Sequence, residues 1–126
     1  VSNRLPPMLK KRLNSFRYAF AGLADLLRTQ PNARIHLLAT LLVLTAGFYF
    51  KISTAEWCAA VLAIVLVFSA EAFNTAIEYL TNLVSPGYHP LAGKAKDVAA
   101  AAVLLAAIGA AAVGLIIFLP KIMAHF

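Results

Sequence analysis

Residues 61–82 read VLAIVLVFSAEAFNTAIEYLTN, and this stretch decides the fold class. Its first eight side chains are all apolar, whereas the remainder carries two glutamates and two asparagines. The pattern predicts a transmembrane helix over residues 55–83, which at ~1.5 Å per residue is longer than a bilayer core of ~30 Å requires. We therefore expect its polar end to reach one membrane interface and to project beyond it.

The polar end of this helix carries its acids and amides on one face. A helix turns by ~100° per residue, so Glu71 and Glu78 lie within roughly 20° of each other around its axis. Asn74 lies between them, and Asn82 follows one turn after Glu78. Charged groups at membrane depth are costly and persist where they function or find partners. The stripe is interpreted either as a site for a divalent cation and a general base or as a polar seam that holds helices together.

Two further apolar runs, residues 33–50 and 97–119, predict two more transmembrane helices. The later run has no charge inside it and contains Gly109 and Gly114. Small residues let helix backbones approach closely, so this helix is expected to pack tightly against others. Residues 84–96 connect the second and third predicted spans and include Ser85, Pro86 and Gly87, which end a helix. We expect them to form a cytoplasmic loop.

The N-terminal part predicts a helix that lies on the membrane surface. Pro6 and Pro7 discourage a helix in residues 1–9, which we expect to be flexible. Residues 10–29 then carry apolar side chains at helical spacing, with basic residues on much of the remaining surface. The apolar positions are Leu13, Phe16, Phe20, Leu23 and Leu27. A bend at Pro31 is expected to separate this helix from the first span.

Composition supports a membrane protein of one domain. Of the 126 residues, 62% are hydrophobic and 13% are charged, against about 25% charged in soluble domains. Seven of the 11 lysines and arginines lie at or before residue 34, which places the N-terminus in the cytoplasm by the positive-inside rule. The basic segment has no aromatic platform or motif for nucleic acid, so we expect a lipid surface rather than nucleic acid as its partner.

The acidic stripe also indicates a chemistry. Mg²⁺ prefers carboxylate oxygens and usually binds together with phosphate groups. His89 and Lys96 are expected on the same side of the membrane as the stripe, where they can contact phosphates. The chain has no Walker A pattern and no Gly-rich phosphate loop, so any nucleotide site must be unconventional. From the residues alone we predict a metal-dependent membrane enzyme and go no further. An acidic stripe that faces a basic loop at a cytoplasmic interface suggests phosphoryl transfer to a molecule embedded in lipid.

One motif resembles a known family. The residues from Glu71 to Glu78, EAFNTAIE, are similar to the signature E-x-x-N-[ST]-A-[IV]-E of the bacterial membrane diacylglycerol kinase and undecaprenol kinase family. The segments YHPLA at residues 88–92 and AKD at residues 95–97 resemble the continuation of that pattern. The resemblance covers roughly residues 15–121.

The resemblance implies an all-α membrane protein of the bacterial inner (cytoplasmic) membrane. It implies a homotrimer whose sites lie between subunits and which transfers the γ-phosphoryl group of ATP to a lipid hydroxyl with Mg²⁺. Glu71 would be the general base, and Asn74 would orient the hydroxyl or the γ-phosphate. Glu78 and Gln30 would hold the metal. The residues implied to contact the nucleotide are Lys11, Tyr18, Gly87, Tyr88, His89, Lys96 and Asp97.

Two positions depart from the family pattern. The family often has Glu where this chain has Gln30, and a neutral amide keeps an acceptor oxygen but loses a charge. The family usually has Asp where this chain has Asn82, which lies past the core of the motif. The first departure puts the affinity for metal and the number of metal ions in question, whereas activity is still expected.

The lipid substrate and two other functions stay open. Residues 32–37 and 83–91 look closer to the undecaprenol kinase branch, so undecaprenol is favoured over diacylglycerol. A non-catalytic membrane assembly subunit would use the stripe only to pair helices. A small proton or ion carrier is a third hypothesis, because intramembrane carboxylates also form proton relays.

Overall fold

A computed structural model of the chain describes residues 4–126, and its regular structure over that range is entirely helical. Four helices follow one another along the chain: α1 (Pro7–Thr29), α2 (Pro31–Phe50), α3 (Thr54–Val84) and α4 (Pro90–His125). The last three are each long and apolar enough to cross a membrane. The prediction of an all-helical protein with three spans is therefore confirmed.

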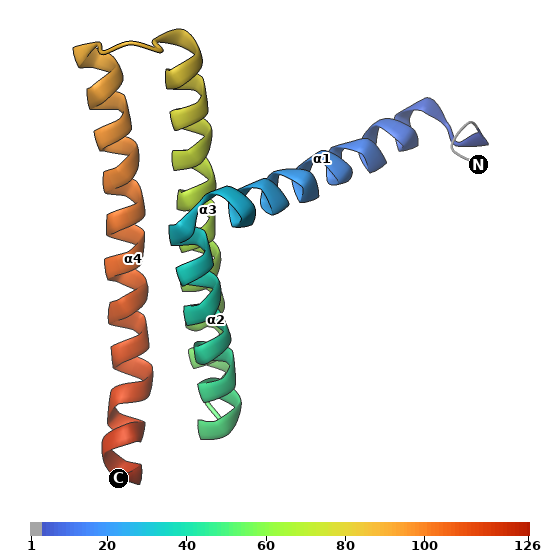
Figure 1. The fold of residues 1–126 in the computed structure, drawn as a ribbon. Helices are drawn as coiled ribbons and strands as arrows, with labels where there is room; N and C mark the ends of the chain where they lie inside the picture. Colours follow the sequence, from blue (N-terminus) through green and yellow to red (C-terminus); the bar gives the residue numbers. More distant parts are fainter. Residues whose placement is uncertain (1–3) are drawn as a thin grey trace.

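The four helices form a bundle of three with one helix projecting sideways (Figure 1). Helices α2, α3 and α4 run side by side in alternating directions, and α3 and α4 pack against each other over the greatest length. Helix α1 leaves the bundle at the point where α2 begins. Beyond that level, α3 and α4 continue for several turns before a short loop joins them.

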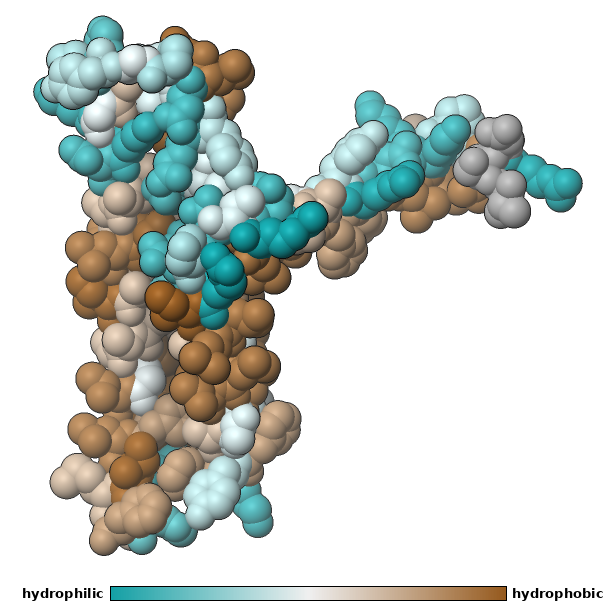
Figure 2. All heavy atoms as spheres, in the orientation of Figure 1, coloured by the Kyte–Doolittle hydropathy of each residue, from teal (hydrophilic) through white to brown (hydrophobic). Residues whose placement is uncertain are grey.

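The hydropathy of the surface follows this arrangement (Figure 2). On the visible face, apolar side chains form a band across the bundle on the side of α1 that contains α2, whereas the projecting ends of α3 and α4 are largely polar. In the same view, α1 is largely polar on its upper side and largely apolar on its lower side. The polar end of α3 thus extends beyond the apolar band, as its length and composition predict.

The first two helices begin with prolines. Helix α1 begins at Pro7 and not at the predicted residue 10, because a proline is well accommodated in the first turn of a helix, where no backbone N–H bond is lost. The prediction of a flexible segment over residues 1–9 is therefore wrong for residues 7–9, which are helical, and residues 1–3 lie outside the described part. Gln30 has an extended backbone between α1 and α2, and Pro31 opens α2, so the predicted bend is present.

The connection between α3 and α4 is shorter than predicted. The expected loop of residues 84–96 is wrong for its second half, because α4 begins at Pro90. His89 caps this helix: its Nδ1 accepts a hydrogen bond of 3.1 Å from the backbone N–H of Leu91. With a cap and a proline at the first helical position, the polar residues Lys96 and Asp97 can lie on the first turns of α4.

The end of the bundle remote from α1 is held by caps and close packing. Ser53 and Glu56 form a capping box at the start of α3, with bonds of 3.2 and 2.9 Å. Lys121 on α4 donates to the Glu56 carboxylate at 2.6 Å. Trp57 lies on Gly47 of α2, where a Cβ atom would come within 2.6 Å of the indole ring. Only glycine allows this approach, which fixes α2 against α3.

Candidate functional site

The predicted stripe on α3 forms a continuous polar row whose burial decreases along the helix. Glu71 is 1% exposed, while Asn74 and Glu78 are partly buried. The side-chain amide of Asn74 donates to Glu78 Oε1 at 3.2 Å. One turn further, the exposed Asn82 accepts a hydrogen bond of 2.6 Å from Lys96 of α4. The row thus runs from inside the bundle to the projecting polar end.

Glu71 is the most buried polar side chain of the described residues. Its Oε1 atom has no hydrogen-bond partner within residues 4–126, and neither has Oδ1 of Asn74 or Oγ1 of Thr75. The nearest basic group is His36 of α2, whose Nε2 lies 3.8 Å from Glu71 Oε1. Buried acceptors without donors are rare and costly in proteins, and each one calls for an explanation. A closer approach of His36, or a group on a bound ligand, would supply such a donor to Glu71.

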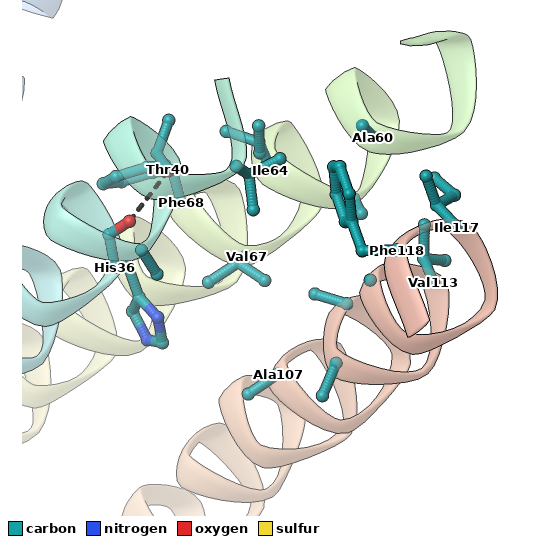
Figure 3. Close-up of a pocket in the computed structure, with 16 residues that line it drawn as sticks. His36, Thr40, Ala60, Ile64, Val67, Phe68, Ala107, Val113, Ile117 and Phe118 are labelled. Carbon is teal, nitrogen blue, oxygen red and sulfur yellow. Dashed lines mark hydrogen bonds between the residues drawn. The ribbon is translucent and has the colours of Figure 1, made fainter. Parts of the chain in front are cut away.

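An apolar groove lies between α2, α3 and α4, and His36 lines one end of it (Figure 3). It has a volume of about 300 Å³, and His36 and Phe68 lie at the end nearest to Glu71. The α4 wall is made largely of small residues: Ala107, Ala110, Ala111 and Gly114. Helix α4 does pack extensively against α3, as predicted, but Gly109 and Gly114 are not the cause within this chain, because a Cβ atom at either position would meet nothing within 4 Å. The small side chains of α4 instead leave the groove open.

The two predicted metal ligands lie on neighbouring elements, and the structure shows no direct contact between them. Glu78 is bound by Asn74, while the amide nitrogen of Gln30 donates to Thr29 Oγ1 at 3.3 Å. Within residues 4–126, no three His, Cys, Asp or Glu side chains gather closely enough to hold a metal ion. The available ligands are one carboxylate and two amide oxygens, a hard donor set that suits Mg²⁺ when phosphates complete its coordination.

The residues implied to contact nucleotide fall into two groups. Gly87, Tyr88 and His89 form the α3–α4 loop, and Lys96 and Asp97 lie close by on α4, all at the projecting end of the bundle. Within this group, the bond from Lys96 places that side chain beside Asn82, at the end of the polar row. The other group, Lys11 and Tyr18, lies on α1, and the structure does not bring it together with the first. Tyr18 is 70% exposed.

One cluster escaped the sequence analysis. Tyr79 of α3 donates to Asp25 Oδ2 of α1 at 2.7 Å, and its hydroxyl lies 3.4 Å from Oγ1 of Thr29. These contacts attach the end of α1 to α3 one residue after Glu78, and they bring the adjacent Gln30 toward that turn. The sequence carried no signal for this pair, because residues 54 positions apart share no local pattern.

The fold and the site define a multi-pass membrane protein with a buried carboxylate above an apolar groove. Residues 17–118 match the family described as prokaryotic diacylglycerol kinase, and the chain belongs to that family. It is therefore a lipid kinase, as the motif predicted.

Curated relatives agree with this assignment. The chain is 41% identical to an undecaprenol kinase of Bacillus subtilis over 90% of its length and 93% of the relative. It is 43% identical to a diacylglycerol kinase of Synechocystis over 88% of its length, but spans only 64% of that protein. It is 30% identical to a diacylglycerol kinase of Escherichia coli K12 over 72% of its length and 75% of the relative. Identity alone does not separate the two lipid substrates.

Proposed function

We propose that this lipid kinase transfers the γ-phosphoryl group of ATP to the hydroxyl group of undecaprenol, with Glu71 as the general base. The observation that carries the proposal is the burial of Glu71 beside His36, which lines one end of an apolar groove. Glu71 takes the proton as the lipid O–H bond breaks. The lipid oxygen bonds to the γ-phosphorus, and the bond from that phosphorus to the ADP oxygen breaks.

The remaining residues of the row position the phosphates. Asn74 orients the lipid hydroxyl or the γ-phosphate through its amide, whose oxygen has no partner within the described residues. Glu78 and Gln30 would hold Mg²⁺ through their oxygens. When bound, this ion neutralises the charge that develops on the transferring phosphoryl group. The nucleotide is contacted by the α3–α4 loop, at Gly87, Tyr88 and His89, and by Lys96 and Asp97 of α4.

The lining of the groove favours a plain alcohol. Besides apolar side chains, the groove is lined only by His36 and Thr40 among the described residues, and the Thr40 hydroxyl already donates to the His36 carbonyl at 2.7 Å. The ester carbonyls of diacylglycerol would find few donors there, and burying them unpaired is costly. The first isoprene units of undecaprenol carry no such groups. The similarity to the Bacillus enzyme over almost the whole of both chains supports the same choice.

The proposed orientation places the active site at the cytoplasmic face of the bacterial inner membrane, where ATP is available. The basic N-terminal segment supports a cytoplasmic N-terminus. Helix α1 lies on the membrane surface, with its apolar side toward the lipid (Figure 2). Three chains form a homotrimer, in which α1 of one subunit brings Lys11 and Tyr18 to the nucleotide of its neighbour.

The test is transfer of labelled phosphate from ATP to lipid by the purified protein in mixed micelles. Undecaprenol and diacylglycerol are offered separately, each with Mg²⁺ and with chelator. We expect metal-dependent labelling of undecaprenol, reduced by about 100-fold or more in Glu71→Gln, because general-base catalysis contributes on that scale. Preferential labelling of diacylglycerol would make this a diacylglycerol kinase. No labelling of either lipid by folded protein would favour a non-catalytic assembly subunit.

A second variant pair tests whether the lipid occupies the groove. Gly114 lines it, whereas Gly109 lies on the same helix but does not. A leucine at either position meets no neighbouring atom through its Cβ within the chain. Gly114→Leu should therefore raise the KM for lipid and leave the KM for ATP unchanged, whereas Gly109→Leu should change neither. Equal effects of the two variants would contradict the assignment of the groove.

A further inference from the structure

His36 is held at the polar end of the groove by contacts that leave its Nε2 atom facing Glu71. Its ring lies edge-on to Phe68, with centroids 6.4 Å apart and an interplanar angle of 77°. Figure 3 shows the imidazole projecting from α2 at this end of the groove. The side chain is 21% exposed, whereas that of Glu71 is 2% exposed. His36 therefore connects the buried carboxylate to the less buried surroundings of the groove.

A general base in this position needs a donor. The proposed reaction requires Glu71 to be ionised before it accepts a proton, and an ionised carboxylate without partners is strongly disfavoured away from water. Among the described residues, His36 supplies the only basic nitrogen within 4 Å of this carboxylate. The gap of 3.8 Å is a few tenths of an ångström too long for a hydrogen bond. Such contacts are often long without substrate and shorten in the reacting complex.

We propose that His36 is a positioning residue for the kinase reaction, donating its Nε2–H to Glu71 Oε1 when the lipid is bound. This inference rests on the proposed function of Glu71. The bond fixes the rotation of the carboxylate and stabilises its ionised form. It leaves Oε2 free to face the lipid hydroxyl and take its proton. His36 thus acts on the rate of phosphoryl transfer through Glu71, without touching the nucleotide.

Three substitutions separate this role from simple packing. His36→Phe keeps a ring against Phe68 but has no donor, so we expect kcat to fall by about tenfold or more, the rate equivalent of one hydrogen bond to a charged group. His36→Gln provides an N–H donor and should retain most of the activity. His36→Ala should be as slow as His36→Phe. The KM for ATP should stay within about twofold in all three, because the ATP contacts are unchanged.

The matched control is His125→Ala. His125 lies at the opposite end of the bundle, where its Nε2 is 3.1 Å from the Tyr49 hydroxyl, so its loss should leave kcat unchanged. Thermal unfolding of every variant shows whether a loss of activity reflects a loss of fold, and the comparison of Phe with Gln decides the matter even where Ala is unstable.

The outcomes distinguish the two proposals. An active wild type, an inactive Glu71→Gln and a His36→Phe variant with wild-type kcat would overturn the role of His36 and leave the proposed function standing. The same holds if His36→Phe and His36→Gln are equally slow, or if only the KM for lipid changes, because His36 would then act as a wall of the groove. A wild type that phosphorylates neither lipid would overturn both proposals.

Discussion

Two carboxylates and two amides supply the acceptor oxygens of the proposed site. Glu71 and Glu78 carry the charge, while Asn74 and Gln30 contribute neutral oxygens. The division matters because the affinity of a site for a hard divalent cation rises with the number of charged ligands. A chain with Gln30 in place of the family's more frequent glutamate should therefore depend on ATP phosphates to hold its metal.

A substitution at Gln30 tests whether metal binding depends on the ATP phosphates. Gln30→Glu keeps the shape of the side chain at the α1–α2 junction and adds a carboxylate, so we predict a roughly tenfold lower Mg²⁺ concentration for half-maximal activity. The measurement is a Mg²⁺ titration of lipid phosphorylation at fixed ATP. Gln30→Ala is the control, and it should not lower the Mg²⁺ requirement. If the titration curve of Gln30→Glu coincides with that of the wild type, Gln30 does not contact the metal.

Substituting Glu71 and Glu56 by glutamine separates a role in function from a role in stability, because the two carboxylates differ in their partners. Glu71 is buried with no donor on Oε1, whereas Glu56 is bound by Lys121 and the backbone of Ser53. We predict that Glu71→Gln stabilises the fold by about 1 kcal/mol, because it replaces a buried carboxylate with an amide that can donate toward the unpaired oxygens of Asn74 and Thr75. Glu56→Gln should destabilise it.

Thermal unfolding in the same detergent compares the two variants. Higher stability together with lost activity in Glu71→Gln would indicate that Glu71 serves catalysis and destabilises the fold. A clear loss of stability in Glu71→Gln would instead indicate that the carboxylate pairs helices, which is the polar-seam interpretation of the stripe.

At the scale of elements, α1 is attached to the bundle through its last turn. The bond from Tyr79 to Asp25 is the shortest side-chain contact between α1 and α3. We predict that Tyr79→Phe costs this attachment about 1 kcal/mol, so that amide hydrogen exchange in the last turns of α1 accelerates by about fivefold. Tyr49→Phe, which removes a hydroxyl at the opposite end, is the control and should leave α1 unchanged. Unaltered exchange in Tyr79→Phe would mean that apolar contacts alone hold α1.

The elements also show what a sequence can predict. Three apolar runs and the 3.6-residue period predict the spans and the polar row of α3, because both depend on local composition and geometry. The predicted start of α4 was too late along the chain. The His89 cap and Pro90 begin the helix early, so the polar residues Lys96 and Asp97 lie within it. The contacts of His36 with Glu71 and of Tyr79 with Asp25 join different helices. No local pattern contains such contacts, so only the packing of the helices reveals them.

At the scale of the whole molecule, a single chain does not bring together the two groups of residues that are implied to contact the nucleotide. The first half of α1 projects away from the bundle and from the α3–α4 loop of the same chain (Figure 1). Lys11 and Tyr18 belong to α1. The wide apolar surface of the three spans requires a lipid or protein environment. A symmetric trimer would let each projecting α1 reach the site of the next subunit, and it would explain why the two groups of nucleotide residues are separate in the chain.

Mixed oligomers test this arrangement. Glu71→Gln disables α3, and a variant with both Lys11→Ala and Tyr18→Ala disables α1; each should be inactive alone. If every site combines α3 of one subunit with α1 of its neighbour, random mixing of the two leaves about a quarter of the sites intact. We therefore predict that their co-expression restores about a quarter of wild-type lipid phosphorylation. Glu71→Gln co-expressed with Glu78→Gln is the control and should restore none, because both residues lie on α3. Absence of recovery in the first mixture would place the whole site within one chain, and α1 would then have to fold back onto its own bundle to reach the nucleotide.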